Sequence, residues 1–101
     1  TVKSFGSNSD GQLCLGDNID KNTPTTVTGL SGVKQVESGF EGHTLILMDD
    51  GTVKACGRND LGQLGLGDDV NRDEPTVVTG LSGVREVIAG SLHTLFLLEY
   101  P

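Results

Sequence analysis

The chain has 101 residues, which is enough for one small domain at most. Its 14 acidic and 7 basic residues give a formal net charge of −7, which opposes direct binding to nucleic acid and provides no polybasic membrane signal. No apolar run approaches the roughly 18 residues of a membrane span. The 35% of hydrophobic residues, taken together with 15 glycines, indicate a globular chain rather than a disordered one.

The chain opens with Thr1–Phe5, a short segment of extended composition that is closed by Gly6. Asn8–Asn22 follows and is rich in Gly, Asp and Asn, the residues that favour tight turns. Leu13 and Leu15 are among its few apolar side chains. We therefore predict a strand, and then a long loop that folds back on itself and is anchored by the two leucines.

An outer strand, a turn and a further strand come next. Thr25–Thr28 is a β-branched run after Pro24, and proline is tolerated at the start of an edge strand. Gly29–Gly32 has the composition of a turn. Val33–Ser38 alternates weakly between apolar and polar residues, which predicts a strand that ends at Gly39.

The most apolar segment is Thr44–Met48, whose apolar run ends at Asp49-Asp50-Gly51. Thr52–Cys56 begins directly afterwards, and Asp-Gly between two such runs predicts a β-hairpin. A strand that is apolar on both faces must be covered on both faces. In an antiparallel protein, this requirement predicts that another sheet packs on each side of the strand.

The second half of the chain repeats the first. A shift of 51 residues places Thr1 on Thr52, and the alignment slips by one residue only before His43. We therefore treat residues 1–101 as a single segment of two repeats, about 1–51 and about 52–101. In the second repeat we expect a loop at Asn59–Glu74 and an outer strand at Thr76–Thr79. A turn at Gly80–Gly83, a strand at Val84–Ala89 and an apolar strand at Thr94–Leu98 should follow.

Each repeat thus combines four short predicted strands with one long loop and has no segment of helical period. Four strands in a repeat of about 50 residues are typical of a β-propeller blade. The neighbours in a ring of blades cover both faces of each sheet, which explains the strand that is apolar on both faces. The predicted fold class is all-β, with four-stranded antiparallel propeller blades that amount to about two blades.

Two motifs resemble the repeat family of the regulator of chromosome condensation. One is GRNDLGQLGLGD at Gly57–Asp68, with a degenerate copy, GSNSDGQLCLGD, at Gly6–Asp17. The other is VIAGSLHTLFL at Val87–Leu97, where a small residue and Gly precede His-Thr and an aliphatic strand. The chain departs from the family pattern at Cys14, where Gly is usual, and in having three residues instead of two before His43.

The resemblance implies a propeller of about seven blades with about 51 residues in each. In that frame the strands from innermost to outermost are Val33–Ser38, Thr44–Met48, Thr52–Cys56 and Thr76–Val78. Val33–Thr79 would be one complete blade between two complementary half-blades. We expect the last strand, Thr94–Leu98, to pair with Thr1–Phe5 of another copy or with the rest of a longer parent chain. A chain that begins with Thr1 rather than Met fits a processed or excised piece.

The two cysteines, Cys14 and Cys56, do not occupy equivalent positions, since Gly65 and Phe5 stand opposite them in the repeats. There is no Cys-x-x-Cys pair and no larger set of cysteines. We therefore expect neither a disulfide scaffold nor a zinc site. Reduced cysteines fit an intracellular protein, either cytoplasmic or nuclear.

No catalytic, cofactor-binding or metal site is expected. His43 and His93 recur at the entry to an apolar strand, but no Ser-His-Asp or Cys-His set can be assembled around them. Structural histidines that bond to backbone explain them better. The acidic segments Asp17–Asp20 and Asp68–Asn71 lack the ligand spacing of a calcium loop. Gly62–Gly67 is followed by Asp, which repels phosphate where a P-loop has Lys.

The long loops and the connections near Phe40 and Leu92 should emerge on one face of the ring, because successive strands alternate in direction. The two repeats differ most on this face, and loops carry binding functions more often than the scaffold does. Phe40 beside Glu41 is the first candidate, and a plug in the central channel is the alternative for Phe40. The expected protein-binding residues are Asp20, Lys21, Phe40, Glu41, Arg72, Asp73, Glu74 and Leu92.

The sequence therefore predicts a protein-binding module without enzymatic activity, acting as a scaffold or regulator. Its acidity suits a basic protein as the partner. The resemblance adds guanine-nucleotide exchange on a Ran-like small GTPase, a chromatin-linked scaffold, a ligase-associated domain and a secreted bacterial enzyme inhibitor as alternatives. The family's plant ultraviolet-B receptor role needs tryptophans, and the chain has none. A structural propeller fragment, natural or designed, that closes a ring as an oligomer is a further alternative.

Overall fold

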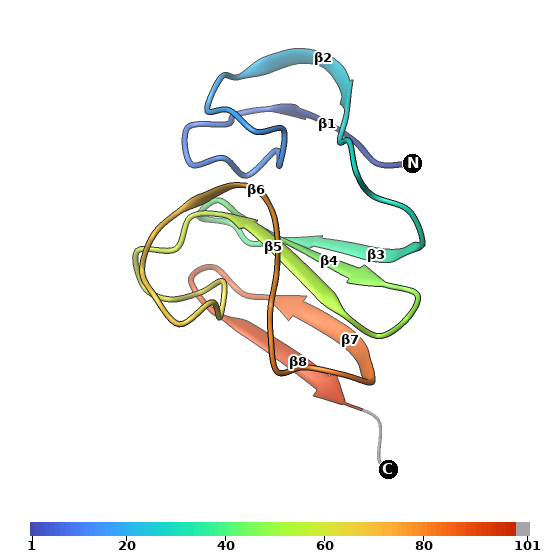
Figure 1. Cartoon of the computed structure of the whole chain (residues 1–101). Helices are drawn as coiled ribbons and strands as arrows, with labels where there is room; N and C mark the ends of the chain where they lie inside the picture. Colours follow the sequence, from blue (N-terminus) through green and yellow to red (C-terminus); the bar gives the residue numbers. More distant parts are fainter. Residues whose placement is uncertain (99–101) are drawn as a thin grey trace.

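Residues 1–98 fold into eight strands that form three antiparallel sheets. The structure, a computed structural model, describes residues 1–98, and no helix occurs in that range. The strands are β1 (Lys3–Gly6), β2 (Lys21–Thr26), β3 (Val33–Ser38), β4 (His43–Met48), β5 (Val53–Gly57), β6 (Arg72–Val77), β7 (Val84–Ala89) and β8 (Thr94–Leu98). Figure 1 shows the sheets stacked one above another, with the largest in the middle.

The middle sheet is a complete four-stranded blade with the strand order β3-β4-β5-β6. Its β3–β4 hairpin pairs Val36 with Ile46, and its β4–β5 hairpin pairs Ile46 with Lys54 across the predicted Asp-Gly turn. Strands β1 and β2 form one half-blade, and β7 and β8 form the other. The predicted all-β architecture of one propeller blade between two complementary half-blades is confirmed.

The two-sided burial of β4 joins the three sheets. Leu45 and Leu47 pack in a cluster that includes residues of β7, whereas Ile46 and Met48 pack in a second cluster with residues of the β1–β2 half-blade. Leu45 and Leu47 are 0% exposed and Ile46 is 1% exposed. Complete burial of a side chain of this size contributes about 1.5–3 kcal/mol. The prediction that a sheet covers each face of this strand is therefore confirmed.

The outer strands begin earlier than predicted. We expected them at Thr25–Thr28 and Thr76–Thr79, but β2 and β6 take up the ends of the predicted loops instead. The reason is a shift of register that lets Gly57 pair with Arg72, and the same shift occurs between β1 and β2. Pro75 consequently lies inside β6. A proline is tolerated there because β6 is the outermost strand and no described strand pairs with its second edge.

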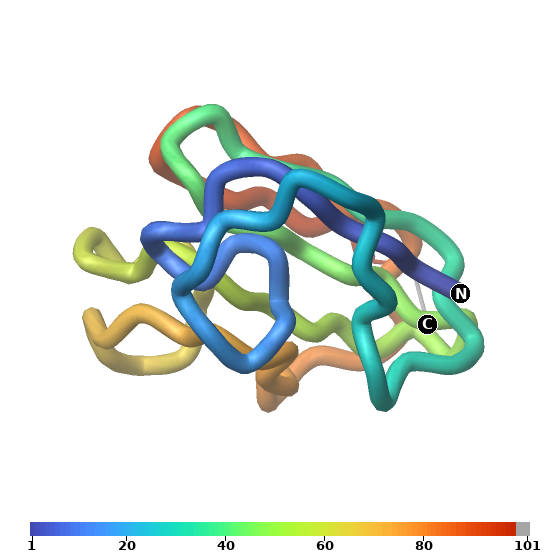
Figure 2. Tube along the Cα trace, turned by 90° about the horizontal axis from the view of Figure 1, so that it is seen from above, coloured from blue at the N-terminus to red at the C-terminus, as the bar shows by residue number. Residues whose placement is uncertain are grey.

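The strand connections are divided between the two ends of the stack. Figure 2 shows the green β3–β4 connection beside the red β7–β8 connection, at the same end as the long loops after β1 and β5. The short β4–β5 turn lies at the opposite end. A hydrogen bond from the Glu41 N–H to the Ser91 carbonyl, at 3.3 Å, joins the two neighbouring connections. The long loops and these connections therefore share one face, as predicted.

Candidate protein-binding face

A buried asparagine organises the long loop after β5. The Asn59 side-chain amide donates hydrogen bonds to the Asp68 carbonyl at 3.2 Å, to Asp68 Oδ1 at 3.0 Å and to the Val70 carbonyl at 2.9 Å. Its Oδ1 accepts the N–H of Leu64 at 2.9 Å. Asn59 and Leu64 are both fully buried. The loop is thus a fixed structure closed around one amide group.

The loop after β1 is built in the same way around Asn8. Its amide binds the carbonyl of Asp17 at 3.0 Å and that of Ile19 at 3.1 Å, and its Oδ1 accepts the Leu13 N–H at 2.9 Å. The predicted leucine anchor at Leu13 is confirmed by its burial. The asparagine was missed in the sequence, although an Asn two residues after the closing Gly in both repeats is a signal that could have found it.

An ion pair connects each loop to the outer strand that follows it. Arg72 Nη2 lies 2.7 Å from Asp68 Oδ2, and Lys21 Nζ lies 3.0 Å from Asp17 Oδ1. The pKa of Asp68 is lowered chiefly by the Arg72 guanidinium, and the pKa of Asp17 is lowered first by a backbone N–H and then by Lys21. Arg72 and Lys21, two of the predicted binding residues, thus begin β6 and β2 and contact a carboxylate in the loop that precedes their strand.

Three more of the predicted residues lie near the outer strands. Asp20 Oδ1 accepts a hydrogen bond from the Asn8 N–H at 2.7 Å, which is an internal contact of the first loop. Asp73 and Glu74 belong to β6, and the first loop packs against this strand, because the Gly16 N–H donates to the Asp73 carbonyl at 2.7 Å. Asp73 and Glu74 therefore lie where neighbouring blades meet at the outer rim, whereas Asp20 contacts only its own loop.

The remaining predicted residues, Phe40, Glu41 and Leu92, come together on the long-loop face. Phe40 is 90% exposed and Leu92 is 38% exposed. Leu61, which is 62% exposed, lines the same hollow as Leu92. We call Phe40, Leu61 and Leu92 the apolar patch. Leu61 was missed in the sequence, although it stands where the first repeat has Asp10 and so belongs to the positions that differ between the repeats.

Carboxylates surround the apolar patch. Arg58 forms a forked pair with Asp60, with Nε at 2.7 Å and Nη2 at 3.0 Å from the two carboxylate oxygens, and its Nη1 lies 3.4 Å from Glu41. Asp60 contributes most to raising the pKa of Arg58, and Glu41 and Asp10 contribute further. The guanidinium is therefore paired with two carboxylates, and Asp10 adds a third negative charge nearby. The rim of the apolar patch is acidic, which suits a cationic partner.

His43 is buried at the junction between the central blade and β8. Its Nε2 lies 3.2 Å from the Thr94 hydroxyl, which donates to the Gln63 carbonyl at 2.7 Å. Burial lowers the pKa of His43. The ring lies against Gly39, where any Cβ would overlap it. His43 is therefore structural, as predicted, and its ring interacts both with the Thr94 hydroxyl and with the backbone of His93 in the next half-blade.

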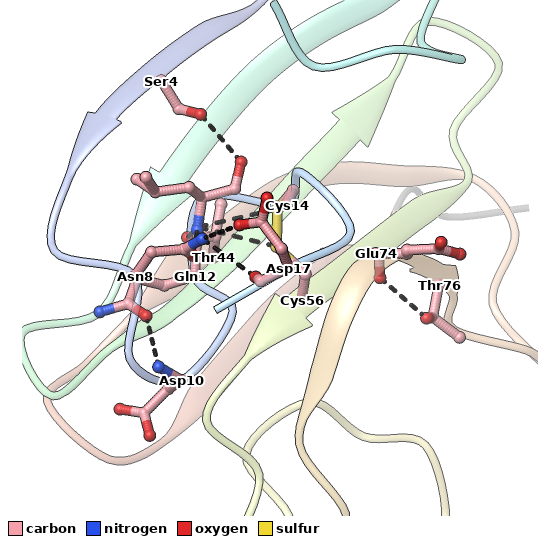
Figure 3. Close-up of a disulfide and its surroundings, with 11 residues drawn as sticks. Ser4, Asn8, Asp10, Gln12, Cys14, Asp17, Thr44, Cys56, Glu74 and Thr76 are labelled. Atoms are coloured by element: carbon pink, nitrogen blue, oxygen red, sulfur yellow. Dashed lines mark hydrogen bonds between the residues drawn. A yellow bond between two sulfur atoms is a disulfide. The ribbon is translucent and has the colours of Figure 1, made fainter. Parts of the chain in front are cut away.

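Cys14 and Cys56 form a disulfide between the first loop and β5, with their Cα atoms 5.7 Å apart (Figure 3). The expectation of reduced, unpaired cysteines is therefore wrong. That expectation rested on the two cysteines lying at positions that are not equivalent in the repeats. The disulfide instead joins two different positions in neighbouring blades. The Thr44 hydroxyl crosses the same junction and donates to the Gln12 carbonyl at 2.8 Å (Figure 3). The cysteines of this chain therefore give no support to an intracellular setting.

The chain matches a family model described as the regulator of chromosome condensation (RCC1) repeat at residues 2–47 and 50–97, and a second model of that description at residues 33–63. It is 38% identical over 98 residues to the Ultraviolet-B receptor UVR8 of Arabidopsis thaliana. It is 41% identical over 88 residues to Protein pim1 of Schizosaccharomyces pombe. It is 36% identical over 99 residues to the X-linked retinitis pigmentosa GTPase regulator of Homo sapiens.

These three matches cover 93%, 71% and 94% of the chain but only 22%, 16% and 10% of the relatives. Among solved structures, yeast RCC1 (Prp20) bound to Kap60 matches with a TM-score of 0.84 and 25% identity, over 95% of this chain and 25% of that one. Prp20p from Saccharomyces cerevisiae, reported with its binding properties to Gsp1p and histones, matches with a TM-score of 0.82 and 24% identity, over 96% of this chain and 26% of that one. The chain thus spans about a quarter of these structures.

Proposed function

The chain belongs to the regulator of chromosome condensation repeat family, and we propose that it is a protein-binding segment of a propeller of that family, without enzymatic activity of its own. The observation that carries the proposal is the apolar patch: Leu61 and Leu92 line one hollow, and Phe40 lies 90% exposed in the connection that bonds to the connection of Leu92 through Glu41 and Ser91. Aromatic and large apolar side chains of this kind supply most of the energy in protein interfaces.

We propose a basic protein as the partner. The acidic rim of Asp10, Glu41 and Asp60 and the net charge of −7 would attract such a surface and orient it over Phe40. The solved structures of the yeast relative name protein partners of that protein, namely Kap60, Gsp1p and histones. If the partner of this chain resembles the histones, the setting is intracellular, with a nuclear location favoured over a cytoplasmic one.

The test compares the binding of core histones, used as a basic probe, to the unchanged chain and to two variants. Phe40→Ala should weaken binding at least about tenfold, because it removes the most exposed side chain of the apolar patch. Ile19→Ala is the matched control, since Ile19 is 66% exposed but lies in the first loop outside the apolar patch, and it should leave binding within about twofold. Calorimetric titration at low and physiological salt measures both effects.

Glu41→Gln tests the acidic rim separately. It should weaken histone binding most at low salt and reduce the dependence of the affinity on salt, because it removes a rim charge and no apolar area. Unchanged affinity of Phe40→Ala, or equal losses in Phe40→Ala and Ile19→Ala, would contradict the role of the apolar patch. Absence of binding to the unchanged chain would remove the basic partner from the proposal.

Guanine-nucleotide exchange on a small GTPase is a second candidate. It is favoured by the names of two similar proteins, the retinitis pigmentosa GTPase regulator and the yeast protein studied with Gsp1p. Because the chain spans about a quarter of the yeast protein, exchange would require loops of further blades. Release of labelled GDP from Gsp1p at least about tenfold faster than the spontaneous rate would support exchange. Binding without acceleration would leave the protein-binding proposal alone.

A further inference from the structure

The loop after β1 (the first loop) and the loop after β5 (the second loop) differ at the position of the disulfide. Cys14 of the first loop occupies the place of Gly65 in the second, and the two residues have φ values of 62° and 70°. The N–H groups of Cys14 and Gly65 each donate to a glycine carbonyl at 3.0 Å, so both loops close in the same way. The second loop therefore shows that this closed conformation needs no disulfide when glycine stands at the left-handed position.

The left-handed backbone of Cys14 favours opening of the first loop. A side chain in this region is disfavoured by a factor of about 5–30, and a loop that opens is relieved of this penalty. The disulfide to Cys56 opposes the opening, because it ties the loop to β5 of the central blade. The closed conformation of the first loop therefore depends on the disulfide.

A thiol reductant can reach the disulfide from one side. Cys14 is 5% exposed and lines a hollow of about 280 Å³ that the first loop forms with β5 and β6, whereas Cys56 is 0% exposed. A thiolate of an external dithiol forms a bond to Cys14 Sγ, and Cys56 Sγ leaves with the electron pair and takes up a proton. The second thiolate of the reductant then displaces Cys14 Sγ, which is also protonated. The protein gains two electrons and two protons, and the dithiol leaves as a cyclic disulfide.

The first loop supports the connection between β3 and β4, which carries Phe40. The Gln12 carbonyl of the loop accepts a hydrogen bond from the Thr44 hydroxyl of β4 at 2.8 Å (Figure 3). A Cβ added at Gly42 would lie 3.0 Å from Asp10 Oδ2, so the loop lies directly against the connection. Movement of the first loop therefore changes the base on which Phe40 stands.

Asp10 brings the first loop to the acidic rim of the apolar patch. Its carboxylate is one of the negative charges beside Arg58, and its N–H donates to Gln12 Oε1 at 2.9 Å. Gln12 lies two residues before Cys14, so the disulfide holds the segment that contains Asp10. Opening of the first loop therefore removes a carboxylate from the rim and support from the connection.

We propose that the Cys14–Cys56 disulfide is a redox-responsive clasp that holds the face with the apolar patch in its binding conformation. In the oxidised chain the first loop is closed and Asp10 lies at the acidic rim. After reduction the first loop opens, and the affinity for a basic protein decreases. The decrease in affinity rests on the proposed function, whereas the opening of the loop does not.

Amide hydrogen exchange of the whole chain tests the opening, with the second loop as the internal control. Dithiothreitol should lower the protection factors of the Leu13 and Cys14 amides at least about tenfold and leave those of Leu64 and Gly65 within about twofold. Cys14→Gly copies the second loop and should stay protected with or without dithiothreitol. Cys14→Ala keeps a side chain at the left-handed position without the clasp, so its first loop should exchange rapidly in both conditions.

Two results of the exchange experiment would overturn the proposal. One is unchanged protection of Leu13 after reduction, since the disulfide would then be dispensable for closing the loop. The other is an equal loss of protection in both loops, which would show that reduction loosens the whole chain rather than the first loop. Rapid exchange of the first loop in Cys14→Gly would contradict the role of the left-handed position.

Calorimetric titration with core histones tests the regulation. The reduced chain should bind at least about fivefold more weakly than the oxidised chain, whereas Cys14→Gly should bind equally, within about twofold, with and without dithiothreitol. Equal affinities of the oxidised and reduced chains, despite opening of the loop, would overturn the regulation. Absence of histone binding by the oxidised chain would overturn the proposed function and the regulation that rests on it, and the exchange experiment still decides the opening of the loop.

Discussion

Loss of the Cys14–Cys56 disulfide should cost more stability than any single exposed contact in the chain. The bond joins residues separated by 42 positions and connects the first loop to β5 of the next blade. In the chain-entropy treatment, a closed loop of that length stabilises the folded state by about 4 kcal/mol. Reduction should therefore lower the free energy of unfolding by about this amount.

The backbone at Cys14 adds a second effect of opposite sign. Cys14 has a φ of 62°, the only positive φ of a non-glycine residue in the part of the chain that the structure describes, and Gly65 has 70° at the equivalent position. A side chain in the left-handed region costs about 1–2 kcal/mol. That cost remains after reduction. Cys14→Gly relieves this cost but also removes a side chain that is only 5% exposed, so it should match the reduced chain within about 1 kcal/mol. Cys14→Ala keeps the backbone cost and should be less stable than Cys14→Gly.

Urea denaturation at one protein concentration, with and without reductant, measures these differences. With a urea m value of about 1–2 kcal/mol/M, reduction should lower the midpoint by about 2–4 M. Cys14→Ala is the control that lacks the disulfide but keeps the backbone cost. Equal midpoints in the oxidised and reduced chain, or two titratable thiols in the native chain without reductant, would refute the reasoning.

Three further predictions concern buried groups and the backbone. Burial holds the pKa of folded His43 below the unfolded value of 6.5, so the folded state binds fewer protons than the unfolded state. The free energy of unfolding should therefore be constant above about pH 6.5 and decrease below it. His43→Gln should flatten this decrease, as measured by urea titrations at several pH values. Asn59→Ala should lower the free energy of unfolding by about 3 kcal/mol, because the four hydrogen bonds of its side chain disappear. Asn18 is exposed, and Asn18→Ala should change the free energy of unfolding by less than about 0.5 kcal/mol in the same assay. Gly57→Ala should lower the thermal midpoint more than Gly67→Ala, because both have a positive φ but only at Gly57 would the added Cβ meet a neighbouring carbonyl; equal shifts would contradict this account.

Part of the candidate site was predictable from sequence comparison alone. Phe40, Glu41 and Leu92 were chosen because the repeats differ there. In the structure a backbone bond from Glu41 to Ser91 joins their two connections, and Leu61 lines the same hollow as Leu92. The charged residues on the outer strands were chosen for the same reason, but the structure gives several of them internal partners, as in the pair of Arg72 with Asp68. Differences between the repeats identify variable positions. They do not tell whether the side chain at such a position binds another protein or a residue of the same chain.

The sequence by itself determined the blade, its four strands and the two-sided burial of β4. Apolar runs and the Asp50-Gly51 turn act over a few neighbouring residues, and the repeat shows the same local patterns twice. Only the tertiary structure decided the contacts between blades. The disulfide of Cys14 with Cys56, the placement of His43 against Thr94 and the start of β6 at Arg72 depend on which surfaces meet after the sheets stack. Such contacts join residues far apart in the chain, and no local pattern specifies them.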